Sequence, residues 1–262
     1  MPAITEAQIA EELRSEDLDE WLRLWRTEQG PAKPGSLELM AAAIPFAPDK
    51  NLHVLDLGCG PGDAGRVIAS RFPNARTDFV DRDLFFISLC AAVNQRDGIH
   101  GRTLVRDLSA SGWRRDFQSD YDVVVAANSL HWFSLEQAAQ LFADIFVLLR
   151  RGGSFLFMEP VSTEAPFASG FARWRNTQPS QHRSEDWINF WSRVNRLLGY
   201  DYIKAEFGER DDQQHIGDRL TVMGWVRLLK NAGFESADIL LRDPEKVVLA
   251  ALKPRDLAPA AG

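Results

Sequence analysis

The sequence predicts an α/β fold in which a doubly wound, mostly parallel sheet carries helices on both faces. Short apolar strands alternate with amphipathic helices over residues 52–158, the pattern of a parallel sheet with covered faces. A glycine-rich turn follows the first of these strands directly. Two more strand-like segments, 237–241 and 247–251, add a late hairpin that a simple nucleotide-binding half-domain would not need.

Hydrophobic periodicity and breaker residues define the elements of this core in chain order. Residues 123–125 are three consecutive valines, typical of a strand buried on both faces. Glycines or prolines at 73, 152–153 and 233 are expected to end three of the helices. The predicted strands are 52–57, 76–81, 103–106, 121–127, 154–158, 237–241 and 247–251, and the predicted helices are 64–71, 84–94, 135–149 and 220–230.

Two further regions surround the core. Residues 1–48 are predicted to form a helical N-terminal lid, with one or two amphipathic helices over 4–28 and another over 36–44. Gly30 and Gly35 bracket a breaker segment that would let this lid move. The core then comprises 49–160 and 216–254, with a helical, aromatic-rich substrate cap inserted at 161–215 and a flexible tail at 255–262.

Composition and charge exclude several classes of protein. The chain has 262 residues, 45% of them hydrophobic, and a formal net charge of −7, which argues against general affinity for a nucleic-acid backbone. Two cysteines at unrelated positions predict neither a disulfide framework nor a metal site. The sequence shows no signal peptide and no apolar run long enough to span a membrane, so a cytoplasmic protein is expected. The oligomeric state is not predicted.

The glycine-rich turn 58–62 favours a cationic ligand. Glycines lack a Cβ atom, so the backbone can turn sharply and a ligand can come close. Asp56 and Asp63 flank the turn, and their carboxylates would repel a pyrophosphate but attract an ammonium or a sulfonium. Residues 60–65 also fit the dinucleotide pattern G-x-G-x-x-G, but Pro61 and Asp63 fall inside that pattern. The turn therefore favours S-adenosylmethionine (SAM) over a nucleotide phosphate.

The run Val54-Leu55-Asp56-Leu57-Gly58-Cys59-Gly60-Pro61-Gly62 resembles motif I of the class I SAM-dependent methyltransferases, hydrophobic-L-D-x-G-C-G-x-G. The resemblance covers residues 51–158 and resumes over 219–254. It implies a Rossmann-like, seven-stranded sheet with an antiparallel last strand, SAM as cofactor and S-adenosylhomocysteine as product. It also implies that the cofactor contacts this motif through Asp56, Gly58, Cys59, Gly60 and Gly62.

Acidic residues at the ends of the next two strands are the candidates for binding adenosine. The resemblance implies that Asp81 accepts hydrogen bonds from both ribose hydroxyls, with Arg82 beside the adenosine. Asp83 is the alternative, although its simpler role is to cap the following helix. The resemblance further implies that Asp107 receives the adenine amine and that the Leu108 backbone N–H meets a ring nitrogen; Asp107 taken alone would be a turn former.

The segment after the fourth strand faces the transferred methyl group in the resembled family. Ser129-Leu130 stands where the methyltransferases of nucleic-acid bases and protein glutamines carry two prolines, which favours the small-molecule branch, whose backbone carbonyl near Asn128 holds the methionine ammonium. His131 is the candidate catalytic residue, which orients the acceptor or takes its proton; alternatively, it only hydrogen-bonds the loop. Trp132 is expected to pack beneath the cofactor.

The expected reaction is transfer of a methyl group from SAM to a small-molecule acceptor by in-line displacement, without a metal. The acceptor atom could be oxygen, nitrogen or carbon, on an organic acid or an aromatic metabolite. Two alternatives remain: a methyltransferase acting on tRNA or protein, and a SAM-binding protein with a non-methylating role.

Overall fold

A computed structural model describes most of the chain. Its described residues are 5–28, 35–118, 120–163, 167–175, 177, 185–199, 216, 220–243 and 245–255. Gly30 of the predicted hinge, residues 200–215 of the predicted cap and residues 256–262 of the predicted tail lie outside them. Within the described residues, no helix combines the length and the apolar character needed to cross a membrane.

Seven strands form one sheet in the order β3-β2-β1-β4-β5-β7-β6. Strands β1 to β5 pair in parallel, whereas β7 pairs antiparallel with both β5 and β6. This confirms the predicted doubly wound sheet with an antiparallel last strand. The strands are β1 (His53–Leu57), β2 (Arg76–Asp81), β3 (Thr103–Val105), β4 (Tyr121–Ala127), β5 (Leu149–Pro160), β6 (Ser236–Arg242) and β7 (Lys246–Leu252).

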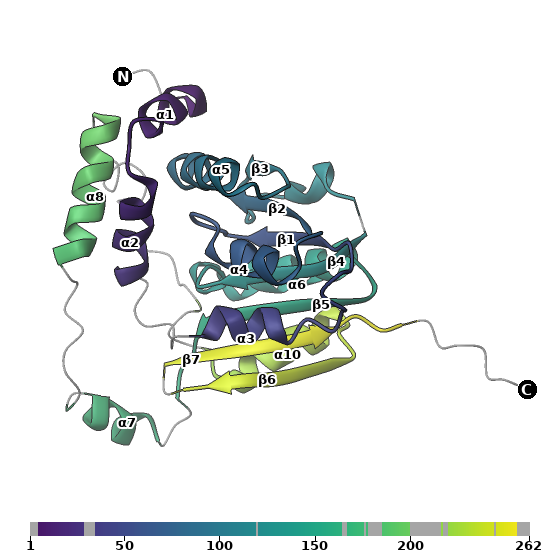
Figure 1. Ribbon diagram of the computed structural model, residues 1–262. Coiled ribbons are helices and arrows are strands. Elements are labelled where there is room, and N and C mark those ends of the chain that lie inside the picture. The colour runs from purple at the N-terminus through teal and green to yellow at the C-terminus, as the bar shows by residue number, and fades with distance from the viewer. Residues whose placement is uncertain are drawn as a thin grey trace, which may run out of the picture.

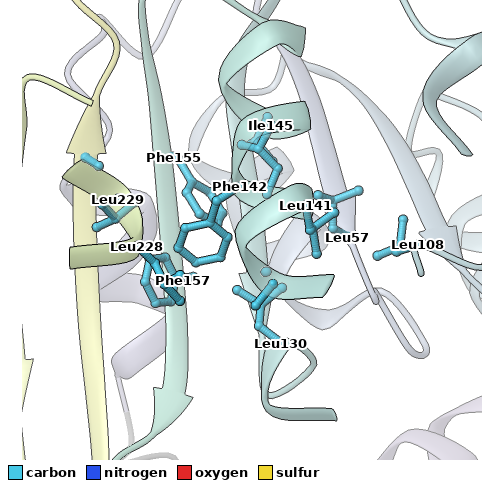
Figure 2. Packing of buried hydrophobic residues seen from close by; sticks show 14 of the residues in the cluster. Leu57, Leu108, Leu130, Leu141, Phe142, Ile145, Phe155, Phe157, Leu228 and Leu229 are labelled. Atoms are coloured by element: carbon cyan, nitrogen blue, oxygen red, sulfur yellow. The ribbon is translucent and has the colours of Figure 1, made fainter. Parts of the chain in front are cut away.

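Helices cover both faces of this sheet. On one face, α3 (Ser36–Ala42) and α4 (Asp63–Arg71) pack against alternate residues of the central strands, such as Val54 and Val123. On the other face lie α6 (Leu135–Leu148) and α10 (Val222–Ala232). Figure 2 shows how α6 and α10 pack against β5. The ring centroid of Phe142 on α6 is 5.3 Å from that of Phe155 and 5.6 Å from that of Phe157, both on β5.

A helical layer stands beside the sheet and joins parts of the chain that are far apart in sequence. It contains α1 (Glu6–Leu13), α2 (Leu18–Glu28), α5 (Leu84–Asp97) and α8 (Glu185–Leu198). Figure 1 shows α2 and α8 side by side, next to the end of the sheet where the parallel strands finish. Aromatic rings hold the layer together, because Trp21 lies edge-on to both Phe85 and Phe190.

The predicted elements differ from the structure mainly at one junction. The glycines at 152–153 were expected to separate helix from strand, but α6 ends at Leu148 and β5 begins at once at Leu149. Gly152 lies inside β5 with φ +71°, so it accommodates an irregular strand start instead of ending a helix. Two short helices add to the predicted set: η1 (Trp113–Asp116) and η2 (Leu130–Trp132). Helix α7 (Ala168–Arg175), like α8, lies in the segment predicted as a helical cap.

Candidate cofactor and acceptor site

The carboxyl ends of the parallel strands bring the predicted site residues to one edge of the sheet. Asp81 ends β2, and the connections after β1, β3 and β4 carry Gly60, Asp107 and His131 respectively. In open α/β sheets, ligands bind at this edge, where the strand order reverses. Here the order reverses between β1 and β4, so the glycine turn and the His131 loop lie on the two sides of that point.

The glycine turn between β1 and α4 is tightly built. Gly58, Gly60 and Gly62 all have positive φ, at +60°, +52° and +90°, a region that disfavours side chains with a Cβ atom. A Cβ atom on Gly58 would lie 2.7 Å from the Ser129 hydroxyl, and one on Gly62 would lie 2.7 Å from the Cys90 sulfur. These two glycines are therefore required by the protein's own packing.

Gly60 is buried, but a Cβ atom there would meet less crowding than one at Gly58 or Gly62. A Cβ atom there would first meet the Trp25 indole, at 3.5 Å. The backbone N–H of Gly60 donates to Asp81 Oδ2 at 2.9 Å, which fixes the second strand's acid beside the glycine turn. Gly60 is thus held between the Asp81 carboxylate and the Trp25 indole.

The two carboxylates that flank the turn are not both available to a ligand. Asp63 pairs with Arg26 at 2.7 Å and with Arg66 at 2.6 Å, so its charge is compensated within the protein. Asp56 is 1% exposed and accepts the Gly65 N–H at 2.8 Å through one oxygen, while its Oδ1 has no hydrogen-bond partner. The sequence-based charge argument was therefore wrong for Asp63, because two arginines that it did not consider reach that residue.

Burial raises the pKa of Asp56 to about 7, although the Gly65 hydrogen bond opposes this shift. A buried carboxylate oxygen without a partner is unfavourable unless a cation or a donor reaches it. This oxygen fits a ligand that carries an ammonium group.

Asp81 and Asp83 have different surroundings at the end of β2. Asp81 is half-buried, and its two oxygens accept the N–H groups of Gly60 and Asp83 at 2.9 Å each. Burial raises the pKa of Asp81, against the effect of these hydrogen bonds. Asp83 caps α5 by accepting the Phe86 N–H at 3.1 Å, so the helix-capping role predicted for it is confirmed. Arg82, between them, is half-exposed.

Asp107, Leu108 and Cys59 occupy three different environments. Asp107 is exposed and accepts the Ser109 N–H at 2.9 Å, as a turn former does. Leu108 is buried in the main core, so its backbone position is fixed. The Cys59 side chain is buried with Cys90, and burial raises the pKa of its thiol well above the usual range. A ligand contact of Cys59 would therefore involve its backbone.

The loop after β4 is held at several points. Asn128 has φ +53°, the one non-glycine residue in the left-handed region among those described, and strain of this kind gathers at functional sites. Its N–H donates to the Met158 carbonyl at 2.8 Å. The Ser129 hydroxyl donates to the Leu57 carbonyl at 3.0 Å. The loop is thereby fastened to the ends of both β1 and β5.

Glu159 on β5 also contacts this loop, and the sequence analysis did not predict a role for it. It is 0% exposed at the end of β5, and its Oε2 lies 2.8 Å from Nδ1 of His131. Burial lowers the pKa of the neighbouring Lys246, and the charge of Glu159 opposes that effect. The sequence did contain a signal for this residue, because a glutamate at the carboxyl end of a buried strand lies at the ligand-binding edge of the sheet. Trp132, beyond His131, is 54% exposed.

Comparisons with known proteins agree with this architecture. Residues 54–153 match the family described as "Methyltransferase domain". In this segment the chain resembles a methyltransferase domain. The match includes the glycine turn, Asp81, Asp107 and His131, whereas Trp25 and Glu159 lie outside it.

Curated relatives extend this methyltransferase match in sequence. Trans-aconitate 2-methyltransferase of Streptomyces avermitilis is 26% identical over 157 residues, which cover 57% of this chain and 56% of the relative. The enzyme of the same name from Mycobacterium ulcerans is 33% identical over 114 residues, 44% of this chain and 39% of the relative. The chain therefore spans about half the length, or less, of the curated relatives it matches.

Solved structures share the fold of this chain. One is the geranyl diphosphate C-methyltransferase of Streptomyces coelicolor, at a TM-score of 0.53 and 15% identity, with 84% of this chain and 80% of that one covered. At this level of identity the similarity concerns the fold alone. Among the described residues, no cluster of three or more histidine, cysteine or acidic side chains could hold a metal ion.

Proposed function

We propose that this chain binds SAM at the carboxyl edge of β1 and β2 and transfers its methyl group to a small-molecule acceptor. The observation that carries the proposal is the junction of Gly60 and Asp81, joined by a hydrogen bond of 2.9 Å. It sets a half-buried carboxylate beside the glycine turn. A carboxylate offers several lone pairs to a ribose diol, and the glycine turn lies at the edge of the sheet where ligands bind in this kind of fold.

The chain's other residues would complete the cofactor site as follows. Asp107 and the Leu108 backbone would receive the adenine, and Arg82 would lie beside the adenosine. The backbone carbonyl near Asn128 and the buried carboxyl of Asp56 would favour the ammonium end. The backbones of Gly58, Cys59 and Gly62 would shape the turn. When bound, SAM supplies a methyl group made electrophilic by its sulfonium.

The protein's contribution to such a reaction is mainly to position the acceptor and exclude water. Good alignment of a nucleophile can contribute on the order of 7–11 kcal/mol to lowering the barrier. The strained and well-bonded loop from Asn128 to His131 is suited to this task, because it lies at the end of β4 on a rigid base. His131 would meet the acceptor from this loop.

We further propose a small organic acid as the acceptor class. The curated relatives named above are trans-aconitate 2-methyltransferases, and their name supports a carboxylate-bearing acceptor for this chain. A tRNA or protein acceptor finds less support, because the chain is acidic overall and these relatives act on a small molecule by name.

The test combines binding with turnover. Calorimetry of the purified chain should show SAM binding, and mass spectrometry should show S-adenosylhomocysteine formed with a panel of di- and tricarboxylic acids and phenols. Asp81→Asn should weaken SAM binding roughly 10- to 100-fold, since a hydrogen bond to a charged group contributes about 1.5–3 kcal/mol. The exposed Asp49→Asn serves as control. Binding without turnover would favour the non-methylating alternative, and no binding of SAM would end the proposal.

A further inference from the structure

Glu159 makes an unusual set of contacts for a fully buried carboxylate. Its Oε1 accepts the backbone N–H groups of Ser129 at 2.8 Å and of Leu130 at 2.7 Å. Its Oε2 accepts the backbone N–H of His131 at 3.3 Å and lies 2.8 Å from the same residue's Nδ1. A buried charge is tolerated only when donors surround it, and here all four donors come from the loop after β4.

The imidazole contact has a definite consequence for His131. An ionised carboxylate can only accept hydrogen bonds, so the ring nitrogen that faces it must carry a proton. With Nδ1 protonated and directed at Glu159, Nε2 of the neutral ring is a hydrogen-bond acceptor on the opposite side. The His131 side chain is 20% exposed, so Glu159 does not enclose the whole ring.

Other contacts also hold this loop in place, so Glu159 is not needed for that purpose alone. Asn128 is bonded to Met158 at 2.8 Å, and Ser129 to Leu57 at 3.0 Å. Leu130 is fully buried in the main core. These three contacts hold the loop without Glu159. The imidazole of His131, in contrast, is hydrogen-bonded to Glu159.

We propose that Glu159 is a positioning residue for the methyl transfer: it holds His131 with the proton on Nδ1 and leaves Nε2 to face the acceptor. This inference rests on the proposed function. Where the acceptor nucleophile carries a proton, that proton moves to Nε2 while the bond from nucleophile to methyl forms. The bond from methyl to sulfur breaks in the same step, and its electron pair stays on sulfur as the neutral thioether. The imidazolium then returns its proton to water.

The first test observes the imidazole directly and needs no turnover. Nitrogen-15 chemical shifts of the histidine rings distinguish the two neutral tautomers, and loss of a signal set in His131→Asn assigns those of His131. The wild-type protein should show Nδ1 protonated. In Glu159→Gln the carboxamide can still accept from the Ser129 and Leu130 N–H groups, but its NH₂ group would face the ring and shift the proton to Nε2. Glu136→Gln, an exposed change on α6, should leave the shifts as in wild type.

The second test separates positioning from structure by kinetics. With an accepted substrate whose nucleophile carries a proton, such as a phenol, Glu159→Gln and His131→Asn should each lower kcat/KM by about 10²-fold, the lower end of what a positioned acid–base group contributes. Their SAM affinities should stay within about twofold of wild type, because the backbone anchors of the loop persist. The double variant should lose no more than either single one, because Glu159 acts through His131.

Specific results would overturn the proposal. A wild-type His131 with the proton on Nε2 would do so, as would additive losses in the double variant. If Glu159→Gln does not fold, the tautomer of His131 in the wild-type protein still tests the proposal. Failure of the proposed function would look different: SAM would not bind, or no acceptor would be methylated, while the nitrogen shifts would still report the orientation of His131.

Discussion

The indole of Trp25 lies against the backbone of Gly60. Its ring carbon Cζ2 would be 3.5 Å from a Cβ atom on that glycine, and its ring centroid is 4.6 Å from that of Phe86 on α5. Trp25 therefore bridges the glycine turn and the first turn of the helix after Asp81. These are the two walls of the proposed cofactor site, so α2 packs against both of them.

Replacing Trp25 should weaken cofactor binding. Trp25→Ala removes an aromatic surface beside the glycine turn, and we expect SAM affinity to fall by about tenfold, or about 1.4 kcal/mol. Calorimetric titration measures this. Ile188→Ala on α8 is the matched control, because Ile188 belongs to the same helical layer but is 60% exposed. Unchanged affinity in Trp25→Ala would show that α2 takes no part in binding.

Two glycines with positive φ offer a matched pair for testing the glycine turn. Gly58 (φ +60°) would place a Cβ atom against Ser129, whereas Gly98 (φ +69°) has nothing within 4 Å. Gly98→Ala should cost about 1 kcal/mol from backbone strain alone. Gly58→Ala should cost a further 1–3 kcal/mol, roughly the penalty of overpacking, and should displace the loop that carries His131. Urea unfolding compares the two; equal losses would contradict the interlock of Gly58 and Ser129.

The buried carboxyl of Asp56 predicts a trade-off between stability and binding. Its folded pKa, about 7, lies above the ordinary 3.8, so its effect on stability is absent at low pH. As the pH rises, the unfolded state loses its proton first, and folding becomes less favourable. Asp56→Asn keeps an acceptor for the Gly65 N–H and removes the charge. It should unfold at a higher temperature than wild type at about pH 8.5 and at a similar one at about pH 4.

The same Asp56→Asn variant should bind SAM less tightly, because the amide no longer attracts an ammonium. Parallel calorimetry checks this second half of the trade-off. If Asp56→Asn is less stable than wild type at high pH, another group already offsets the charge of the Asp56 carboxylate in the free protein.

His53 predicts a pH dependence at the opposite end of the sheet. Its Nε2 lies 3.5 Å from the buried Asp78, and its Nδ1 lies 3.2 Å from Asp120. Arg102 and Tyr121 also bond Asp78. The hydrogen bond to Asp78 is the main cause that raises the pKa of His53, and burial opposes it. The stabilisation is therefore complete below the ordinary histidine value of about 6.5 and is lost as the pH rises through the raised folded value.

The melting temperature of wild type should accordingly decline as the pH rises from about 6 to about 9. His53→Gln should flatten this decline, and His100→Gln, an exposed histidine, should leave it in place. Part of the decline up to about pH 7 comes from Asp56 and should remain in His53→Gln; a decline of undiminished size there would assign the whole effect to other groups.

Local sequence patterns were sufficient to predict the sheet and most of the candidate site. Alternating apolar strands and helices gave the doubly wound core, and the glycine turn and acids after β1, β2 and β3 lie at one edge as expected. These features depend on short stretches of chain, where periodicity and turn residues decide the structure.

Contacts between distant segments could not be predicted in the same way. Arg26 compensates Asp63, Trp25 covers Gly60, and Glu159 bonds the loop after β4. Each joins residues from separate elements, and one sequence without its fold gives no pairing for them. The roles of Asp81, Asp107 and Asn128 as cofactor ligands stay predictions for the binding experiments.

The aromatic layer of Trp21 and Phe190 has a consequence for how the chain is made. During translation α2 is synthesised early and α8 only after β5. The side of α2 that packs against α8 therefore stays uncovered by α8 while the central strands are synthesised. Nascent chains with unpartnered apolar surface are prone to aggregation. Production of the protein should therefore depend on chaperone supply during that interval more than the stability of the finished fold would suggest.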